Sequence, residues 1–536
     1  MEPQLIAEKS NTLESPPNAI SLGHARRGFT INILSNIAFV GSQAVLTLWL
    51  TPYFIGYLGL AGYGMIPLIQ NIVTYTGILT TSFNSAVSRY LTIELGRGDD
   101  TASNKTFNTA LFSILGLFIV LSPAIMVLAV VFPHLFNVPI GWETDASWLV
   151  MLTAFTFFVA VAGGIFSVSA FVHSEFFKYN LANFAGIFAR VFCVIALFSL
   201  FSPHLWYAGI ATLIAAFVSF TGYVILWRKL TPELKIQRSA FDRTQFVEIT
   251  TMGGWLVVNM AGAILLSRVD LIVVNMYFGA AMTGAYASLV QFTFLMEYLV
   301  TAAGNVVRPV ILIKYAQQDM EGLRILSAQS VKLFGYGMAL PVGLLCGFAQ
   351  PFLSIWLGPT FTYLSWLFVA ILVHQALNYS VRPLLFVQNA YNKVKWPGIV
   401  TLICGIASLV LGILFARWNI WGVIGVALAV GLSWTIKNAL YMPVYTALIM
   451  KLKWWTFFPS LIPSILGTVF VMLISYGFTL IKMPGNWFSL IGMVISVSIF
   501  YTFLVWFFGL NRTDRKLIIS LLPFLNKFRI IFQASE

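Results

Sequence analysis

The chain has 536 residues, of which 59% are hydrophobic and 9% are charged, and its formal net charge is +13. Soluble proteins carry about 25% charged residues, so this chain has too few charges to cover a soluble surface, and the bilayer must be its main solvent. The excess of positive charge is typical of the cytoplasmic loops of a membrane protein, and we do not expect nucleic-acid binding.

A membrane-spanning helix needs about 20 consecutive, mostly apolar residues. By this criterion the sequence predicts an all-α polytopic membrane protein with about fourteen transmembrane helices. Residues 1–28 are polar and typical of a cytoplasmic tail rather than a signal peptide. Residues 511–536 mix basic and apolar side chains, which predicts a cytoplasmic amphipathic tail. The predicted spans lie near residues 29–53, 64–90, 106–132, 146–172, 183–201, 205–227, 247–277, 283–313, 327–355, 360–390, 396–416, 420–450, 456–481 and 485–510.

The distribution of basic residues indicates the orientation. If the N-terminus is cytoplasmic, 24 of the 31 Lys and Arg residues fall in cytoplasmic segments, two (Arg417 and Lys482) fall outside, and five lie within spans. An error of one span would invert every later loop and destroy this asymmetry. We therefore expect a multi-pass protein of the inner (cytoplasmic) membrane with both termini in the cytoplasm.

A sequence pattern near residue 53 recurs about 220 residues later. Residues 52–64 contain Pro-Tyr-Phe-Ile-Gly and then Gly-Tyr-Gly, and residues 277–286 contain Tyr-Phe-Gly and then Gly-Ala-Tyr. Because each copy would have six spans, both begin on the cytoplasmic side, which predicts two parallel six-helix lobes with a substrate site between them. The predicted parts are an N-lobe at 29–227, a cytoplasmic linker at 228–246, a C-lobe at 247–450 and two C-terminal helices within 456–510.

Four short motifs near the N-terminus carry a family resemblance. They are Tyr53-Phe54-Ile55-Gly56-Tyr57-Leu58-Gly59, Gly62-Tyr63-Gly64, Ser88-Arg89-Tyr90 and Leu95-Gly96-Arg97-Gly98-Asp99. Together they resemble the polysaccharide transport family, the O-antigen and capsule oligosaccharide flippases of the multidrug/oligosaccharidyl-lipid/polysaccharide exporter superfamily, most sharply over residues 29–105. The resemblance implies two six-helix bundles around a central cavity, alternating access, and a polyprenyl-diphosphate-linked oligosaccharide as cargo.

Charged residues within spans are the main candidates for a site. A charge near the bilayer centre costs at least about 2.5 kcal/mol, so it normally faces a partner or a wet cavity. Five such residues are basic and two are acidic, an excess that suits an anionic cargo such as a diphosphate, whose oxygens Arg binds through a planar fork. For Arg89, Arg190 and Lys437, snorkelling or structural pairing is an equal alternative. The candidate substrate-binding residues are Arg268, Arg308, Arg382, Asn305, Asn378, Arg89, Asn84, Arg190 and Lys437.

Three further residues are candidates for ion coupling: Glu297, Asp270 and His374. Glu297 lies eleven residues before Arg308, about three helical turns, so the two share a helix face. His374, Asn378 and Arg382 form an i, i+4, i+8 stripe. For His374, a hydrogen bond that packs two helices is the alternative to a proton relay. Arg268 and Asp270 are two residues apart and are not expected to pair.

The sequence contains no phosphate-binding Gly-x-x-x-x-Gly-Lys-[Ser/Thr] loop and no His-Glu-x-x-His or Cys-x-x-Cys motif. We therefore expect no ATPase activity of its own, no cofactor and no metal centre. The sequence predicts a transporter, not an enzyme. Its expected partners are a lipid-linked oligosaccharide, membrane lipids and a coupling proton or sodium ion, with polysaccharide-assembly proteins as further candidates.

Two other functions stay open. A multidrug-type ion-coupled exporter would usually have twelve spans and acidic cavity residues, whereas this sequence suggests fourteen spans and a basic cavity. A membrane glycosyltransferase or polymerase would need an acidic catalytic group at an interface and a sizeable outer loop. Glu143 and Asp145 are the only acidic pair in a predicted outer loop, and the outer loops are short.

Overall fold

The computed structural model describes the backbone of residues 19–521 and their side chains outside 19–34, 36–37, 40, 76–86, 248–259 and 519–521. Over that range the chain is helical, without a β-strand. The elements are α1 (Ala19–Gly96), α2 (Asp100–Leu135), α3 (Glu143–Val172), α4 (Phe176–Leu200), α5 (Trp206–Leu230), η1 (Arg238–Ala240), α6 (Arg243–Ala316), α7 (Met320–Gly347), α8 (Ala349–Trp356), η2 (Pro359–Leu364), α9 (Ser365–Leu372), α10 (Gln375–Ser380), α11 (Arg382–Ala390), α12 (Lys395–Arg417), α13 (Val423–Thr435), η3 (Ile436–Tyr441), α14 (Met442–Ile449), η4 (Phe458–Leu461), α15 (Ile462–Ile481), α16 (Trp487–Leu504), η5 (Val505–Gly509) and α17 (Arg512–Leu521).

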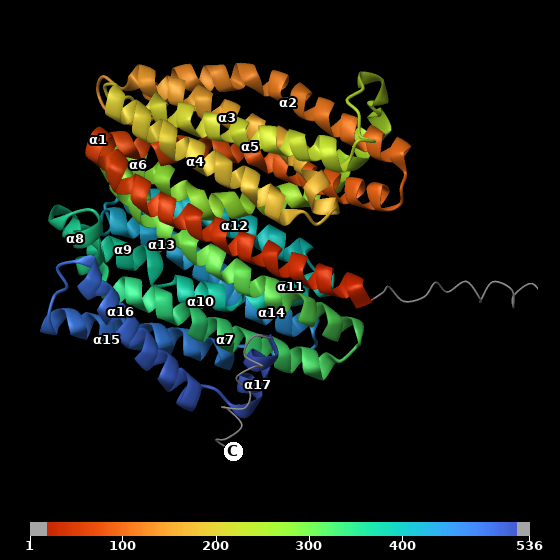
Figure 1. Cartoon of the computed structure of the whole chain (residues 1–536). Helices are drawn as coiled ribbons and strands as arrows, with labels where there is room; N and C mark the ends of the chain where they lie inside the picture. Colours follow the sequence, from red (N-terminus) through yellow and green to blue (C-terminus); the bar gives the residue numbers. More distant parts are fainter. Residues whose placement is uncertain (1–18, 522–536) are drawn as a thin grey trace, which may run out of the picture.

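Two of the helices are too long to cross a membrane once. A straight helix of the 78 residues of α1 would be about 117 Å long, against a hydrocarbon core about 30 Å thick. Each of α1 and α6 is instead two arms joined at a glycine, Gly59 (φ 66°) in α1 and Gly279 (φ 80°) in α6. Only glycine adopts such backbone angles without strain. The chain therefore turns back on itself at these two positions (Figure 1).

Within the described residues, 12 helical segments are long and apolar enough to cross a membrane. The predicted all-α polytopic fold is thus confirmed. The count of 12 does not by itself confirm the predicted fourteen spans. It takes α1 and α6 as one segment each, and fourteen spans result if the two arms of each helix cross the membrane separately. The predicted N-terminal tail, 1–28, lies mostly outside the described residues, and α1 already begins at Ala19.

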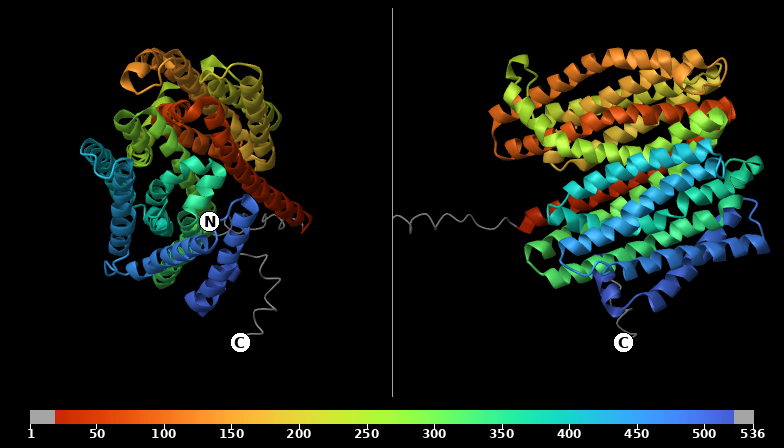
Figure 2. Two further views of the ribbon diagram at one scale, coloured as in Figure 1. Left: turned by 90° about the vertical axis from the view of Figure 1, so that its left-hand side faces the viewer. Right: turned by 180° about the vertical axis from the view of Figure 1, so that it is seen from behind.

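The helices lie side by side in two groups (Figure 1). Helices α2 to α5 pack with α1 and with one another, and α4 contacts its first arm, while α7 and α9 to α13 pack with α6. The first arm of α1 runs between the groups, and α15 and α16 lie along the edge of the second group (Figure 2). We call the end of the bundle that carries the segment between α5 and α6 the linker end, and the opposite end, with Gly59 and Gly279, the far end.

At the far end, Asn137 and Asn275 join the two groups through reciprocal amide hydrogen bonds. The backbone N–H of Asn137 donates to Asn275 Oδ1 (2.9 Å), and Asn137 Nδ2 donates to the Asn275 carbonyl (2.7 Å). Asn275 Nδ2 in turn donates to Thr283 Oγ1 at 3.1 Å, within α6. Asn275 is fully buried and Asn137 is exposed, so this uncharged clasp joins the two groups at the surface of the far end.

At the linker end, two asparagines one helical turn apart on α2 bind the extended chain after α5. Asn104 accepts from the Lys235 N–H (2.8 Å) and donates to the Glu233 carbonyl (2.7 Å). Asn108 repeats this pattern two residues later, accepting from the Gln237 N–H (2.7 Å) and donating to the Lys235 carbonyl (2.8 Å). The linker is therefore fixed to the first group of helices.

The same end carries the start of α6. Asp242 caps this helix, accepting from the N–H groups of Thr244 (2.8 Å) and Gln245 (3.2 Å), and these donors hold the pKa of Asp242 below its usual value. Lys105 on α2 lies 3.8 Å from the Asp242 carboxylate. The beginning of α6 is thus attached to α2, although the rest of α6 packs with the second group.

The end of the described chain also has a defined place. Helix α15 packs along α7, and α17 is attached to α7 by an ion pair between Lys332 Nζ and Asp514 Oδ2 at 2.7 Å. Asp514 is buried. The predicted amphipathic tail therefore begins as a short docked helix, and residues 522–536 lie outside the described part.

Candidate functional site

A cavity of about 530 Å³ lies where the two arms of α1 meet the two arms of α6. Its size is within the usual range for a small-molecule site, about 300–1,000 Å³. Its wall is partly polar, although it lies within the apolar bundle. The polar and basic lining residues are Gln43, Thr47, Thr51, Tyr63, Gln70, Asn71, Arg190, Arg268, Gln291 and Tyr298. None of the lining residues described is acidic.

Arg268 projects from the first arm of α6 toward α1. Its Nη1 donates to Asn71 Oδ1 at 2.7 Å, and its guanidinium lies 4.3 Å from the centre of the Phe294 ring. Both contacts orient the side chain, and the carboxylates of Asp270 and Glu297 are close enough to attract it without forming an ion pair. Arg268 therefore presents a fixed positive charge to the central cavity.

Arg190 comes from α4, in the first group of helices, and also lines this cavity. Its Nε is buried and has no hydrogen-bond partner among the described residues. No ion pair between Arg190 and a described carboxylate is present. The cavity thus receives one basic side chain from each group of helices.

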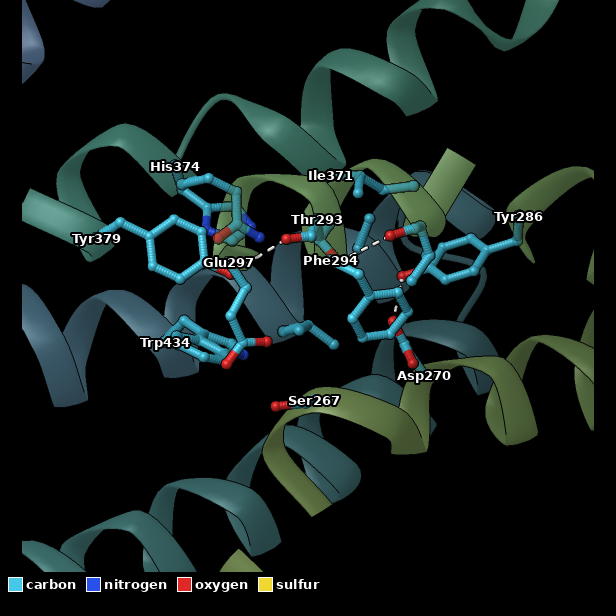
Figure 3. Close-up of a pocket in the computed structure, with 14 residues that line it drawn as sticks. Ser267, Asp270, Tyr286, Thr293, Phe294, Glu297, Ile371, His374, Tyr379 and Trp434 are labelled. Carbon is cyan, nitrogen blue, oxygen red and sulfur yellow. Dashed lines mark hydrogen bonds between the residues drawn. The ribbon is translucent and has the colours of Figure 1, made fainter. Parts of the chain in front are cut away.

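A second, much smaller cavity lies within the second group of helices and holds all three predicted ion-coupling residues. It has a volume of about 40 Å³, enough for water or a small ion, and its wall includes Asp270, Glu297 and His374 (Figure 3). Asp270 accepts from the Tyr286 hydroxyl (2.9 Å) and from the Leu271 N–H (2.9 Å). As predicted, Arg268 and Asp270 form no ion pair, because they line different cavities.

His374 is held from two sides in this smaller cavity. Asn378 Nδ2 donates to His374 Nδ1 at 2.9 Å and lies 3.3 Å from Thr435 Oγ1. On the other side, a Cβ at Gly431 would lie 2.7 Å from His374 Cδ2, so the imidazole occupies space that only glycine leaves free. Asn378 therefore orients the His374 ring through a hydrogen bond and does not line the central cavity.

The predicted stripe of His374, Asn378 and Arg382 is only partly formed. Helix α10 ends at Ser380, and α11 begins at Arg382 with Pro383 as its second residue. Proline disfavours helix at the preceding residue and cannot donate into the helix. The stripe accordingly holds between the first two residues and does not extend to Arg382.

Other predicted substrate residues lie away from the two cavities just described. Asn305 and Arg308 are exposed near the end of α6, and Arg89 is exposed near the end of α1. The shared helix face of Glu297 and Arg308 therefore does not bring both to one cavity. Asn84 lies in the stretch 76–86, whose side chains are outside the described part.

Lys437 lies on η3, a π-helical turn between α13 and α14. Such turns are rare and occur often at functional sites. Its amine is 5.9 Å from the ring of Trp434, which lines the smaller cavity. Arg382 is close enough to Lys437 to repel it electrostatically. Lys437 therefore lies next to a wall residue of the smaller cavity, and Arg382 lies near Lys437.

Several lining residues did not emerge from the sequence. Asn71, which binds Arg268, and Tyr286, which binds Asp270, were missed. An amide within an apolar run was the available signal for Asn71, since polar groups within a span need a partner. Tyr286 gave no such signal, because tyrosine is common throughout these spans.

The comparisons with known proteins agree with this architecture. The family described as "Polysaccharide biosynthesis protein" matches residues 29–312. The uncharacterized membrane protein EpsK of Bacillus subtilis (strain 168) is 27% identical over 492 residues, which cover 92% of this chain and 97% of EpsK.

Solved structures show the same fold. The lipid II flippase MurJ, in an inward closed conformation, has a TM-score of 0.64 at 17% identity, covering 91% of this chain and 100% of the other. An inward-facing multidrug resistance MATE family transporter of the MOP superfamily has a TM-score of 0.56 at 14% identity, covering 76% and 98% of the two chains.

The chain is a multi-pass membrane protein with the fold of these solved structures. The family match covers more than half of the chain. The chain therefore belongs to the polysaccharide biosynthesis protein family, and the resemblance noted in its N-terminal motifs is confirmed.

Proposed function

We propose that this protein is a flippase that moves a polyprenyl-diphosphate-linked oligosaccharide from the inner to the outer leaflet of the cytoplasmic membrane by alternating access. The observation that carries the proposal is the pair Arg190 and Arg268, which come from different groups of helices and line one cavity without an acidic lining residue. The protein would act as a transporter and not as an enzyme.

A basic side chain within the bilayer is costly unless it faces a partner or a wet cavity. The central cavity offers Arg268 an amide and an aromatic ring but no carboxylate. A diphosphate would bring negative charge into this cavity, and each guanidinium group can bind two phosphate oxygens. An organic cation would meet repulsion, which argues against a multidrug-type exporter.

Energy for uphill movement would come from an ion gradient. Asp270 and Glu297 lie on the wall of the smaller cavity, which is large enough for a single small ion. Val290 and Phe294 line both cavities, which are therefore neighbours. Proton or sodium binding in the smaller cavity could thus alter the position of the helix that carries the wall of the larger one.

Orientation follows from the charge distribution. The linker end would face the cytoplasm, with both termini on that side, because the loops there carry most of the basic residues. The far end would face outward, closed by Asn137 and Asn275.

The test is translocation in proteoliposomes. The purified protein is reconstituted with a polyprenyl-diphosphate oligosaccharide, and the exposure of the saccharide in the opposite leaflet is measured with a membrane-impermeant lectin. We expect protein-dependent translocation that is lost when Arg190 and Arg268 are both replaced by Gln. Equal translocation by the folded double variant, or sugar transfer by the purified protein, would overturn the proposal.

A further inference from the structure

A third cavity, of about 360 Å³, lies within the first group of helices and has no part in the mechanism above. It is enclosed by α1, α3, α4 and α5. It shares two lining residues with the central cavity, Gln43 and Arg190. The two cavities therefore meet at Arg190, and a ligand whose charged group binds there could extend into either one.

The wall of this N-lobe cavity carries several hydroxyl and amide groups beside its apolar residues. The hydroxyls of Ser167, Thr212 and Ser219 each donate to a backbone carbonyl, so their remaining lone pairs can accept from a ligand. Tyr223 donates to Asn183 Oδ1 at 2.6 Å. These hydroxyl groups already donate within the protein, and their remaining lone pairs suit a ligand that is rich in hydroxyl donors.

The aromatic residues of the wall add a second kind of contact. Tyr179 and Tyr223 stack with ring centres 5.2 Å apart, and both line the cavity with Phe220. Saccharides combine hydroxyl groups with apolar C–H faces, so they need hydrogen-bonding groups and aromatic surfaces together. A polyprenyl chain would need only the apolar surfaces.

The cavity is long in one direction. From Tyr179 to Arg190 along α4 the lining extends over eleven residues, about 16 Å at 1.5 Å per residue. Tyr179 lies near the linker end of α4, because α4 begins at Phe176. The lining therefore runs from the linker end of the bundle to the basic side chain at the central cavity.

We propose that the N-lobe cavity is the saccharide subsite of the flippase, in which the sugars next to the diphosphate bind while the diphosphate itself lies at Arg190. This inference rests on the proposed function. It adds that recognition of the sugar belongs to the α3–α5 side of the molecule, whereas Arg268 and the smaller cavity belong to the other side.

The test uses a filled cavity and a matched control on the same helix. Ala216 lines the cavity, whereas Ile214, two residues earlier on α5, is 38% exposed on the outside of the bundle. The probes are a polyprenyl diphosphate carrying an oligosaccharide and the same polyprenyl diphosphate without sugar, and the measurement is the affinity of purified protein for each.

We expect Ala216→Phe to weaken binding of the saccharide-bearing lipid at least tenfold and to leave binding of the bare diphosphate unchanged. Ile214→Phe should change neither, and Arg190→Gln should weaken both. If Ala216→Phe leaves both affinities unchanged, or lowers both equally, the saccharide subsite is wrong, while loss of both in Arg190→Gln still supports the flippase. If Arg190→Gln binds both probes normally, the proposed function itself fails.

A second measurement does not depend on tolerance of the bulky phenylalanine. In a variant in which the three native cysteines are replaced, Ala216→Cys should react with a small water-soluble thiol reagent. The saccharide-bearing lipid should protect this cysteine and the bare polyprenyl diphosphate should not. Equal protection by both lipids would show that the prenyl chain occupies the cavity, and absence of protection would show that neither group does; either result contradicts the proposal.

Discussion

Gly64 and Gly284 pack backbone against backbone where the second arms of α1 and α6 cross. A Cβ on Gly64 would lie 2.5 Å from the Gly284 nitrogen, and a Cβ on Gly284 would clash with the Leu60 carbonyl oxygen. The two glycines occupy equivalent positions of the internal repeat, as do Gly59 and Gly279. The repeat found in the sequence thus corresponds to a contact between its own two copies.

This contact predicts the effect of adding one methyl group. Gly284→Ala should push the two second arms apart and lower stability by about 1–3 kcal/mol, the usual cost of overpacking. The measurement is the thermal midpoint in detergent, together with the translocation rate. Gly56→Ala is the control, because a Cβ there meets no atom within 4 Å. An unchanged midpoint for Gly284→Ala would contradict the close packing.

The central cavity predicts a ranking among three variants of two arginines. Arg268→Ala should slow translocation at least tenfold, because a hydrogen bond to a charged group contributes about 1.5–3 kcal/mol. Arg268→Lys should keep part of the activity, since a point charge replaces the planar fork. Arg308→Ala should have little effect, since Arg308 is exposed and outside the described lining. The rates are compared in proteoliposomes at equal amounts of folded protein, and the reverse ranking would exclude Arg268 from the site.

The smaller cavity predicts which residues respond to an ion gradient. Asp270→Asn and Glu297→Gln should each reduce the dependence of translocation on an imposed proton or sodium gradient. Tyr286→Phe should weaken it less, because it removes only the 2.9 Å hydrogen bond to Asp270 and leaves the charge. Glu143→Gln, at the exposed start of α3, is the control. If the acidic variants keep full gradient dependence, coupling occurs elsewhere.

The proposed orientation predicts the labelling of introduced cysteines in a cysteine-free variant. Ile140→Cys, at a far-end position that is 96% exposed, should react with an impermeant thiol reagent added outside sealed cells. Lys235→Cys, in the linker, should react only after the membrane is opened. Ile140 is preferable to its neighbour Gly141, whose φ of 86° a side chain would strain. Labelling of Lys235→Cys in sealed cells would reverse the orientation.

The asparagine pair on α2 predicts the behaviour of the linker. Asn108→Ala removes two hydrogen bonds to the linker backbone, so residues 238–240 should be cleaved several times faster by an added protease. Ser122→Ala is the control, because its hydroxyl bonds only within α2. Equal cleavage rates would mean that the linker does not depend on Asn108.

Much of the fold could be predicted from hydrophobicity and charge. The runs of about 20 apolar residues marked the helices, and the Tyr277-Phe278-Gly279 motif marked the second hairpin, because a chain that turns back within a few residues needs glycine. The sequence did not predict that α1 and α6 would each stay helical on both sides of a turn made by one glycine. Nor could it show the break before Arg382, which depends on local competition between Pro383 and the preceding turn.

The candidate site could be predicted less well. The cost of burying a polar or charged side chain in the membrane identified Arg268, Asp270 and His374 as residues that need a partner or a wet cavity. The structure places each of them at the wall of a cavity. The cost of burial does not distinguish these residues from Arg308, since hydropathy alone does not say which face of a helix is turned inward. Asn71 and Gln43 have no charge and become notable only when the opposite helix is known.

The clasp between Asn137 and Asn275 contains amides and backbone groups only. Among the described contacts at the other end of α6, by contrast, Lys105 faces the Asp242 carboxylate. Salt screens charges and does little to neutral hydrogen bonds. A change in ionic strength should therefore leave the Asn137–Asn275 clasp at constant strength, while the contact between Lys105 and Asp242 weakens as salt rises.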